Sequence, residues 1–305
     1  MTVVLSVFFS DILPIFLIAG IGYLLASRLQ ANVKTLAHVV FYALAPCLAF
    51  RMLVTSKMTG PEAGRMALLA VLVLVVMGLL ARLVAIPLGL RGPELSAFLL
   101  VVMLSNGGNY GLPVVLFAFG ERALAPATVF FVTSSILTYT VGVSVAAAGS
   151  RSLFRAITGI AKIPVIYGMA AAVFFSVSGI EIPVAVMRPV QLLSDAAIPI
   201  MILVLGMQLE RATKPERVSV VAAAVGLSLL AAPFVSLGLT SVLGLSSAGR
   251  QAGVILASMP TAVITTILAL EFDVAPAFVT NVVFVTTLLS PVTLAPLIAY
   301  LMKMN

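Results

Sequence analysis

The sequence predicts an all-α polytopic membrane protein, with ten transmembrane helices arranged as two inverted five-helix repeats. Three observations support this: the composition, ten apolar runs, and prolines that recur at a constant offset. Of the 305 residues, 62% are hydrophobic and only 9% are charged, whereas a soluble domain is about 25% charged. This composition excludes a soluble enzyme, a disordered protein and a nucleic-acid-binding protein, and makes the lipid bilayer the expected surroundings.

Ten apolar runs are candidates for membrane spans, because about 20 apolar residues cross the hydrocarbon core as a helix. They cover residues 4–27, 35–55, 64–88, 94–119, 123–148, 159–178, 185–208, 217–243, 250–270 and 274–301. Each span with its loop takes roughly 30 residues, so a separate soluble domain does not fit.

The basic residues indicate an orientation. The net charge of +7 comes from Lys and Arg residues at the ends of the apolar runs, where the positive-inside rule places them. With the N-terminus outside, ten of the 17 basic residues face the cytoplasm, six of them in the loops at 150–162 and 210–217. We therefore expect a multi-pass protein of the cytoplasmic (inner) membrane with both termini outside. The first basic residue is Arg28, so a cleaved signal peptide is not expected.

Prolines recur in order at an offset close to 150 residues, which divides the chain into halves at 1–150 and 151–305. The pairs are Pro14 with Pro164, Pro46 with Pro199, Pro113 with Pro260 and Pro126 with Pro276, and Glu121 recurs as Glu271. Five spans per half make the second half enter the membrane from the opposite side. Inverted repeats with broken helices are typical of secondary transporters, which bind substrate near the midplane.

Span four is expected to unwind at its centre. It contains Ser105-Asn-Gly-Gly-Asn-Tyr-Gly-Leu-Pro113, in which glycine permits non-helical backbone and proline removes a backbone donor. Unwound backbone at membrane depth must line a cavity or be buried in protein. The candidate binding residues here are Asn106, Gly107, Asn109, Tyr110 and Pro113. A Gly/Pro packing kink between helices is the alternative.

Span nine has a milder break at Met259, Pro260 and Thr261. Each break starts a new half-helix, and the free amides and positive dipole end of a helix N-terminus attract anions. The two breaks together therefore predict a carboxylate-binding site. A packing kink is again the alternative.

Single polar residues in other spans have two interpretations each. Ser135 and Tyr139 could bind substrate or join helices by hydrogen bonds. Asp195, inside span seven, could carry a coupling proton or hold a cation, or it could cap a helix beside a vestibule. His38 could be a proton switch or simply solvated. Arg51 could meet a substrate carboxylate or extend to the headgroups.

The sequence argues against cofactors and enzymatic chemistry. Cys47 and His38 are the only residues of their kinds, so no disulfide and no site of several imidazoles or thiolates is expected. A nucleotide-binding loop and the serine and zinc hydrolase motifs are missing as well. The driving force would be a proton gradient, a sodium gradient or the gradient of the substrate itself. A channel or a transporter-like sensor remains an alternative to a carrier.

At these residues the chain resembles the auxin efflux carrier family, which includes plant PIN-type carriers and bacterial malonate-type permeases. The matching pieces are Leu13-Pro14 with Gly20-Ile-Gly-Tyr-Leu24, Ala45-Pro46 with Phe50, the trio Asn106, Gly111 and Pro113, Met259-Pro260 with Ala269-Leu-Glu271-Phe272, and Ser290-Pro291.

The resemblance implies a ten-helix fold like that of bile-acid/sodium symporters, in which spans four and nine cross at their prolines. It also implies a scaffold of spans one, two, six and seven, a transport domain of spans three to five and eight to ten, elevator-type movement, and a homodimer formed through the scaffold. The implied substrate is a small organic anion, such as malonate or an auxin-like acid, held around Asn106, Pro113 and Pro260. Plant members carry an acid within the third helix, but span three here has only Arg65 and Arg82 near its ends, so the coupling ion stays open.

Overall fold

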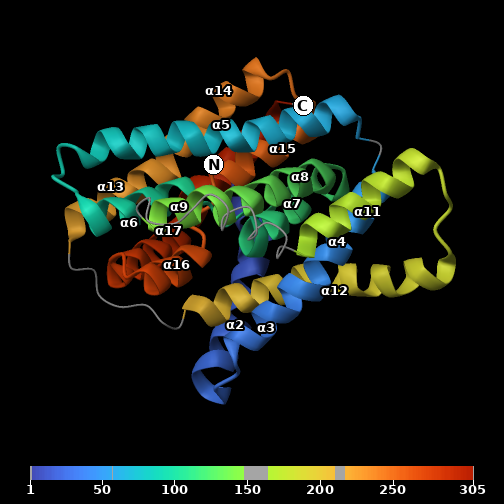
Figure 1. Ribbon diagram of the computed structural model, residues 1–305, viewed down its shortest axis with the longest axis horizontal. Coiled ribbons are helices and arrows are strands. Elements are labelled where there is room, and N and C mark those ends of the chain that lie inside the picture. The colour runs from blue at the N-terminus through green and yellow to red at the C-terminus, as the bar shows by residue number, and fades with distance from the viewer. Residues whose placement is uncertain (1, 57, 148–163, 210–216, 305) are drawn as a thin grey trace.

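The computed structural model describes residues 2–56, 58–147, 164–209 and 217–304, and within these it is a bundle of helices (Figure 1). The basic loop at 150–162 and most of the one at 210–217 lie outside the described residues, as does the midpoint of the expected repeat. The only extended pairing in the described part is an isolated bridge between Ser105 and Thr261. The predicted all-α class is confirmed.

The helices follow the predicted apolar runs to within a few residues. In chain order they are α1 (Thr2–Val7), η1 (Phe8–Ile12), α2 (Leu13–Leu29), α3 (Val33–Val39), η2 (Val40–Leu44), α4 (Ala45–Val54), α5 (Gly60–Ala85), α6 (Gly92–Met103), η3 (Gly107–Gly111), α7 (Leu112–Phe119), α8 (Glu121–Leu137), η4 (Thr138–Gly142), α9 (Val143–Ala146), α11 (Pro164–Ser178), α12 (Val184–Leu209), α13 (Val218–Gly226), η5 (Leu227–Ala231), α14 (Ala232–Val242), α15 (Ser247–Ala257), α16 (Ile264–Phe272) and α17 (Pro276–Lys303). Seven helices in the described residues are long and apolar enough to cross a membrane, and α6, α11 and the η3–α7 segment are shorter apolar helices.

Four of the π-helical turns, η1, η2, η3 and η5, end two residues before a proline. These prolines are Pro14, Pro46, Pro113 and Pro233. Proline lacks an N–H group and its ring collides with the carbonyl one turn earlier. A turn with the wider π spacing makes room for the ring without ending the helix. The prolines therefore shape the spans rather than terminate them.

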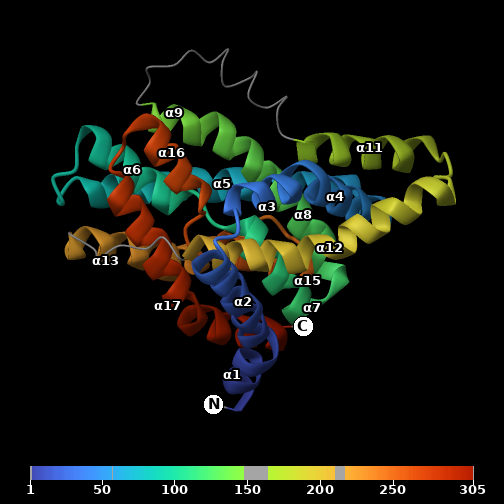
Figure 2. The ribbon, with the colours of Figure 1, turned by 90° about the horizontal axis from the view of Figure 1, so that it is seen from below.

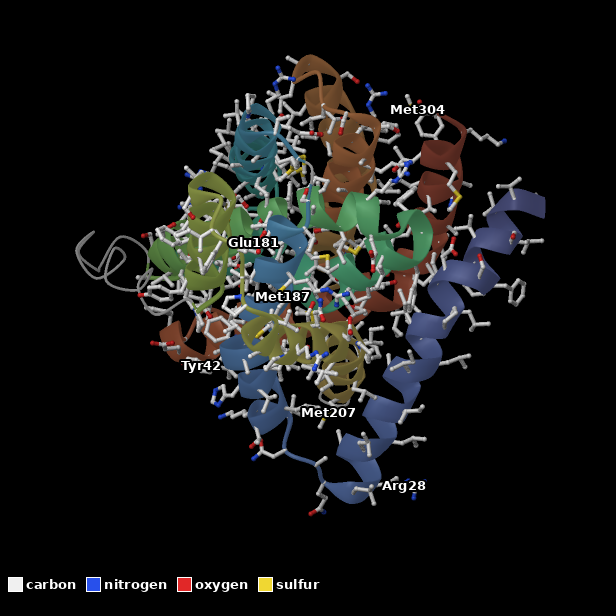
Figure 3. All side chains as sticks on the ribbon, turned by 90° about the vertical axis from the view of Figure 1, so that its right-hand side faces the viewer. Arg28, Tyr42, Glu181, Met187, Met207 and Met304 are labelled. Atoms are coloured by element: carbon white, nitrogen blue, oxygen red, sulfur yellow. The ribbon has the colours of Figure 1, made fainter. Side chains whose placement is uncertain are left out.

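One group of helices packs closely through small residues. In this group α12 lies against α2 and α4, and α11 lies against α4. A Cβ atom at Gly22 would collide with the Leu203 carbonyl, and one at Gly206 with the Ala19 carbonyl. Small residues let helix backbones approach this closely. The α11–α12 hairpin extends beyond the other helices in two views (Figures 1 and 2). Figure 3 shows Arg28 near the end of the first span, on the outside of the bundle.

The second group consists of α5 to α8 and α13 to α17. Within it α5 packs against α6, α8 and α14, and α15 packs against α7, α8 and α14. Its core holds fully buried side chains that include Met66, Leu69, Phe98 and Phe130. Contacts between the two groups include those of α12 with η3 and α7, and those of η1 with α7 and α17. Further contacts join α1 to α17 and α4 to α8. The break in span four therefore lies at the boundary between the groups.

Candidate functional site

Both predicted breaks are present. In span four, α6 ends at Met103, and the chain passes through extended backbone at Leu104 and the η3 turn before α7 begins. In span nine, α15 ends at Ala257 and α16 begins at Ile264. The physical signals used in the sequence, glycine and proline inside apolar runs, thus locate the interruptions correctly.

The two breaks cross as a short antiparallel pair. The Asn106 N–H donates to the Pro260 carbonyl at 2.7 Å, and the Ala262 N–H donates to the Leu104 carbonyl at 2.8 Å. The resemblance implied a crossing at both prolines, and Pro260 does lie in it. Pro113 instead lies seven residues beyond Asn106, in the first turn of α7. We call residues 104–106 and 260–262 the crossing.

Two hydroxyl groups at the crossing satisfy carbonyls at the ends of the broken helices. Ser105 Oγ donates to the Leu256 carbonyl of α15 at 2.9 Å, and Thr261 Oγ1 donates to the Val101 carbonyl of α6 at 2.7 Å. The last carbonyls of a helix have no partner within it, so these bonds close both helix ends. The Thr261 N–H in turn donates to Thr286 Oγ1 on α17 at 3.2 Å.

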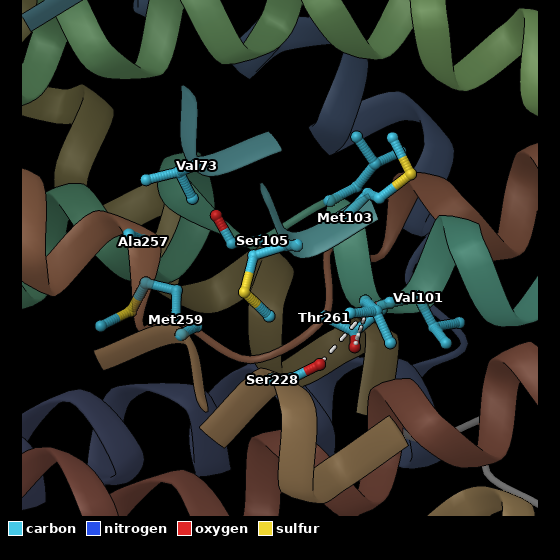
Figure 4. Close-up of a pocket in the computed structure, with 12 residues that line it drawn as sticks. Val73, Val101, Met103, Ser105, Ser228, Ala257, Met259 and Thr261 are labelled. Carbon is cyan, nitrogen blue, oxygen red and sulfur yellow. Dashed lines mark hydrogen bonds between the residues drawn. The ribbon is translucent and has the colours of Figure 1, made fainter. Parts of the chain in front are cut away.

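The crossing is closed in this conformation. A cavity of about 10 Å³ lies beside it, lined by residues that include Ser105, Ser228, Met259 and Thr261 (Figure 4). Such a volume holds about one water molecule. The cavity is therefore too small for a carboxylate while the two segments stay paired. Sequence reasoning missed Ser228, whose hydroxyl donates to the Val101 carbonyl at 3.4 Å. Its signal was a hydroxyl five residues before Pro233 in span eight.

Asn106 carries an unused donor at the crossing. Its residue is 6% exposed, and within the described part of the chain its Nδ2 is buried without a hydrogen-bond partner. A buried polar group left unpaired costs about 1–3 kcal/mol, so an acceptor placed there would bind favourably. Asn109 lies half-buried on η3.

The glycines of η3 allow close packing around Asn106. A Cβ atom at Gly108 would lie 2.7 Å from the Phe131 ring, and one at Gly111 would lie 3.1 Å from Met259 Cγ. A Cβ at Gly107 would make only ordinary contacts, the nearest at 3.7 Å to Leu256. Gly108 and Gly111 therefore need to be small for packing reasons, and Gly107 does not.

Three predicted substrate-binding side chains have other partners. Tyr110 is fully buried, and its hydroxyl accepts a hydrogen bond from Ser290 Oγ at 3.1 Å. Ser135 Oγ donates to the Phe131 carbonyl of its own helix at 2.9 Å, and the Tyr139 ring lies 6.2 Å from that of Phe41. Among the described residues, none of the three forms a hydrogen bond to the crossing. A role in binding for them needs a rearrangement.

Asp195 and Arg51 form an ion pair between α12 and α4. From the sequence alone, each of them has a separate predicted role. The Arg51 side chain is 22% exposed and the Asp195 side chain 64% exposed. The pair satisfies both charges in this conformation.

His38 is exposed, and its ring lies edge-on to Tyr42 with centroids 5.9 Å apart, so it lies apart from the crossing residues that the structure brings together.

A larger cavity of about 520 Å³ opens where α4, α5, α8 and the start of α15 meet, and its polar lining includes Glu62, Glu121, Arg122 and Ser246. Glu62 accepts a hydrogen bond from the Ser246 hydroxyl, which also caps α15 by accepting from the Gly249 N–H at 3.1 Å. Sequence reasoning missed this cavity, because its wall comes from four separate segments.

Comparisons with known proteins agree with the geometry. The model of the membrane transport protein family matches residues 7–298. An uncharacterised transporter of Methanothermobacter thermautotrophicus is 27% identical over 294 residues, which cover 93% of this chain and 95% of that protein. An uncharacterised transporter of Methanocaldococcus jannaschii is 26% identical over 279 residues, 87% of this chain and 89% of that protein. The resemblance is confirmed: the chain belongs to the membrane transport protein family, that of the auxin efflux carriers, and is a multi-pass membrane transporter rather than an enzyme.

Proposed function

We propose that the protein is a secondary active transporter that carries a small organic carboxylate across the cytoplasmic membrane by elevator-type alternating access. The observation that carries this proposal is the crossing of two broken helices beside the unpaired Asn106 amide. Malonate and an auxin-like aromatic acid are the substrate classes we favour.

The chemistry of the crossing suits a carboxylate. The first turn of a helix has free N–H groups and a partial positive charge, and η3–α7 and α16 both begin beside the crossing. The Asn106 Nδ2 adds a donor. The residues that line the cavity at the crossing are all uncharged. A site of dipoles and amides without a fixed cation holds an anion and can also release it, as a carrier requires.

The packing supports a moving transport domain. Spans one, two, six and seven pack together through α2, α4, α11 and α12, and the remaining spans form the second group. The crossing is closed while the 520 Å³ cavity is open at the ends of α4, α5 and α8. Sliding of the second group along the first would give the site access to each side in turn. The reciprocal Ser105 and Thr261 bonds support the inverted repeat, and we retain both termini outside and the homodimer as part of the proposal.

Counterflow in proteoliposomes tests this function. Vesicles preloaded with unlabelled malonate should transiently accumulate labelled malonate, and the rate should saturate with external concentration. Indole-3-acetate forms a parallel series. A channel would equilibrate the label without overshoot, and a sensor would bind without flux, so either result would exclude a carrier. Liposomes without protein and liposomes with the Asn106→Ala protein serve as controls.

A further inference from the structure

Asp11 is an acidic residue buried inside the first span. It lies in the η1 turn, within a 27-residue apolar stretch from Val3 to Leu29, and is 8% exposed. Its Oδ1 accepts a hydrogen bond from Ser10 Oγ at 2.8 Å. Its Oδ2 is buried and, within the described residues, has no hydrogen-bond partner. An ionised carboxylate in such a position costs free energy, and an acidic residue within a membrane span is a candidate functional residue.

Among the described residues, no cation forms an ion pair with Asp11. Its turn packs against α1, α2, α7 and α17, and α1 and α7 have no ionisable side chain. On α2 the ionisable groups are Tyr23 and Arg28, which are at least 12 residues away, or about 18 Å along a helix. On α17 they are Tyr300 and Lys303, both in its last four residues, and Lys303 forms no ion pair with Asp11 among the described residues. In the described part of the chain, the ion pairs do not include Asp11.

The energetics favour a proton on this group while it is packed. A buried charge without a partner costs several kcal/mol, and protonation of the carboxylate to the neutral acid removes that cost. When water reaches the carboxylate, the charged form is solvated and the proton is released. The charge state of Asp11 and its packing against α7 and α17 are therefore linked.

The same region connects to the crossing. Phe16, in the same span, packs edge-on against Tyr110 with centroids 6.0 Å apart, and Tyr110 bonds to Ser290 of α17. Thr286, also on α17, accepts from the Thr261 N–H. A movement that opens the crossing therefore changes the contacts between the first span and α7 or α17.

We propose that Asp11 is a proton-binding site that couples proton movement to transport: it is protonated while η1 packs against α7 and α17, and it releases the proton when these elements separate. This rests on the proposed function. The reaction is the reversible addition of one proton to the Asp11 carboxylate, so it needs no other reactant. A neutral Asp11 favours the packed conformation and a charged one favours the separated conformation, which is a charge-driven shift between two states.

Infrared spectroscopy tests the proton site without any transport assay. The sequence contains three aspartates, Asp11, Asp195 and Asp273, so labelling with ¹³C-aspartate marks three carboxyl groups. In liposomes at neutral pH, we expect one protonated-carboxyl carbonyl band that shifts on labelling, persists in Asp195→Asn and disappears in Asp11→Asn. The labelled wild-type protein keeps the test valid even if Asp11→Asn fails to fold. Absence of a protonated aspartate band would overturn the proposal.

Transport tests the coupling. With the membrane potential clamped at zero, one proton coupled to one monovalent carboxylate gives about tenfold accumulation per pH unit. We expect this in the wild-type protein, whereas Asp11→Asn should equilibrate the substrate without accumulation. Accumulation by Asp11→Asn, or accumulation driven by sodium alone, would overturn the coupling role. Absence of carboxylate flux in every protein would refute the proposed function instead, and the infrared band would still decide whether Asp11 binds a proton.

Discussion

Ser105 and Thr261 lie opposite each other where the two broken spans cross, and each hydroxyl donates to a carbonyl of the helix that leads into the other break. Neither bond is local, because the partners are 151 and 160 residues apart. The unwound segments are thus held by each other. This mutual arrangement explains how extended backbone persists in an apolar core, where unsatisfied carbonyls would be costly.

Removing the Thr261 hydroxyl should loosen the crossing. Thr261→Val preserves the side-chain shape but leaves the Val101 carbonyl with only the longer Ser228 contact, which should cost about 1–3 kcal/mol. The measurement is thermal unfolding in detergent. Thr128→Val is the matched control, because this buried hydroxyl donates only to the Leu124 carbonyl of its own helix. Equal melting temperatures for the two variants would contradict the proposed role of Thr261.

A negative charge at Asn106 should abolish carboxylate binding. Asn106→Asp replaces the unpaired amide donor with a group that repels an anion, so substrate-induced thermal stabilisation and uptake should both disappear. Asn32→Asp is the control, since Asn32 caps α3 by accepting from the Thr35 N–H and aspartate caps equally well. Wild-type binding by Asn106→Asp would remove the crossing from the substrate site.

The Arg51–Asp195 pair can be tested by exchanging its charges. If the two residues act as an ion pair between α4 and α12, Arg51→Asp and Asp195→Arg should each reduce uptake, and the double variant should recover it. Exposed pairs contribute about 0.2–1 kcal/mol, so the change in stability should be small. If Asp195 binds the coupling ion directly, as its position in span seven suggested, the double variant would instead stay uncoupled. Uptake with and without a pH or sodium gradient separates the two roles.

Two glycines of one helix should differ sharply in their tolerance of alanine. A Cβ atom at Gly22 meets the Leu203 backbone, whereas one at Gly20 has no atom within 4 Å. Gly22→Ala should therefore force α2 away from α12 and destabilise the protein by about 1–3 kcal/mol. Gly20→Ala should be neutral or slightly stabilising, because alanine favours a helix over glycine. Thermal unfolding checks both, and similar melting temperatures would show that α2 and α12 do not pack as closely as described.

Composition and local chemistry were enough to predict the membrane class, the spans and the two breaks. An apolar run of sufficient length has to form a helix in the bilayer, because every backbone group needs an internal partner. Glycine and proline weaken such a helix, and the sequence around Asn106 and Pro260 indicated both breaks without knowledge of their neighbours. Proline alone does not decide a break, because Pro291 and Pro296 lie inside the uninterrupted α17.

The tertiary structure alone decided which groups meet. It placed the crossing at Leu104–Asn106 rather than at Pro113, paired Arg51 with Asp195 and joined Tyr110 to Ser290. Among the described residues it also left the Asp11 Oδ2 buried without a hydrogen-bond partner. In an apolar chain almost any helix face can pack against another, so hydrophobic pattern does not select the neighbours. That selection comes from close backbone approach at small residues and from hydrogen bonds between segments more than a hundred residues apart.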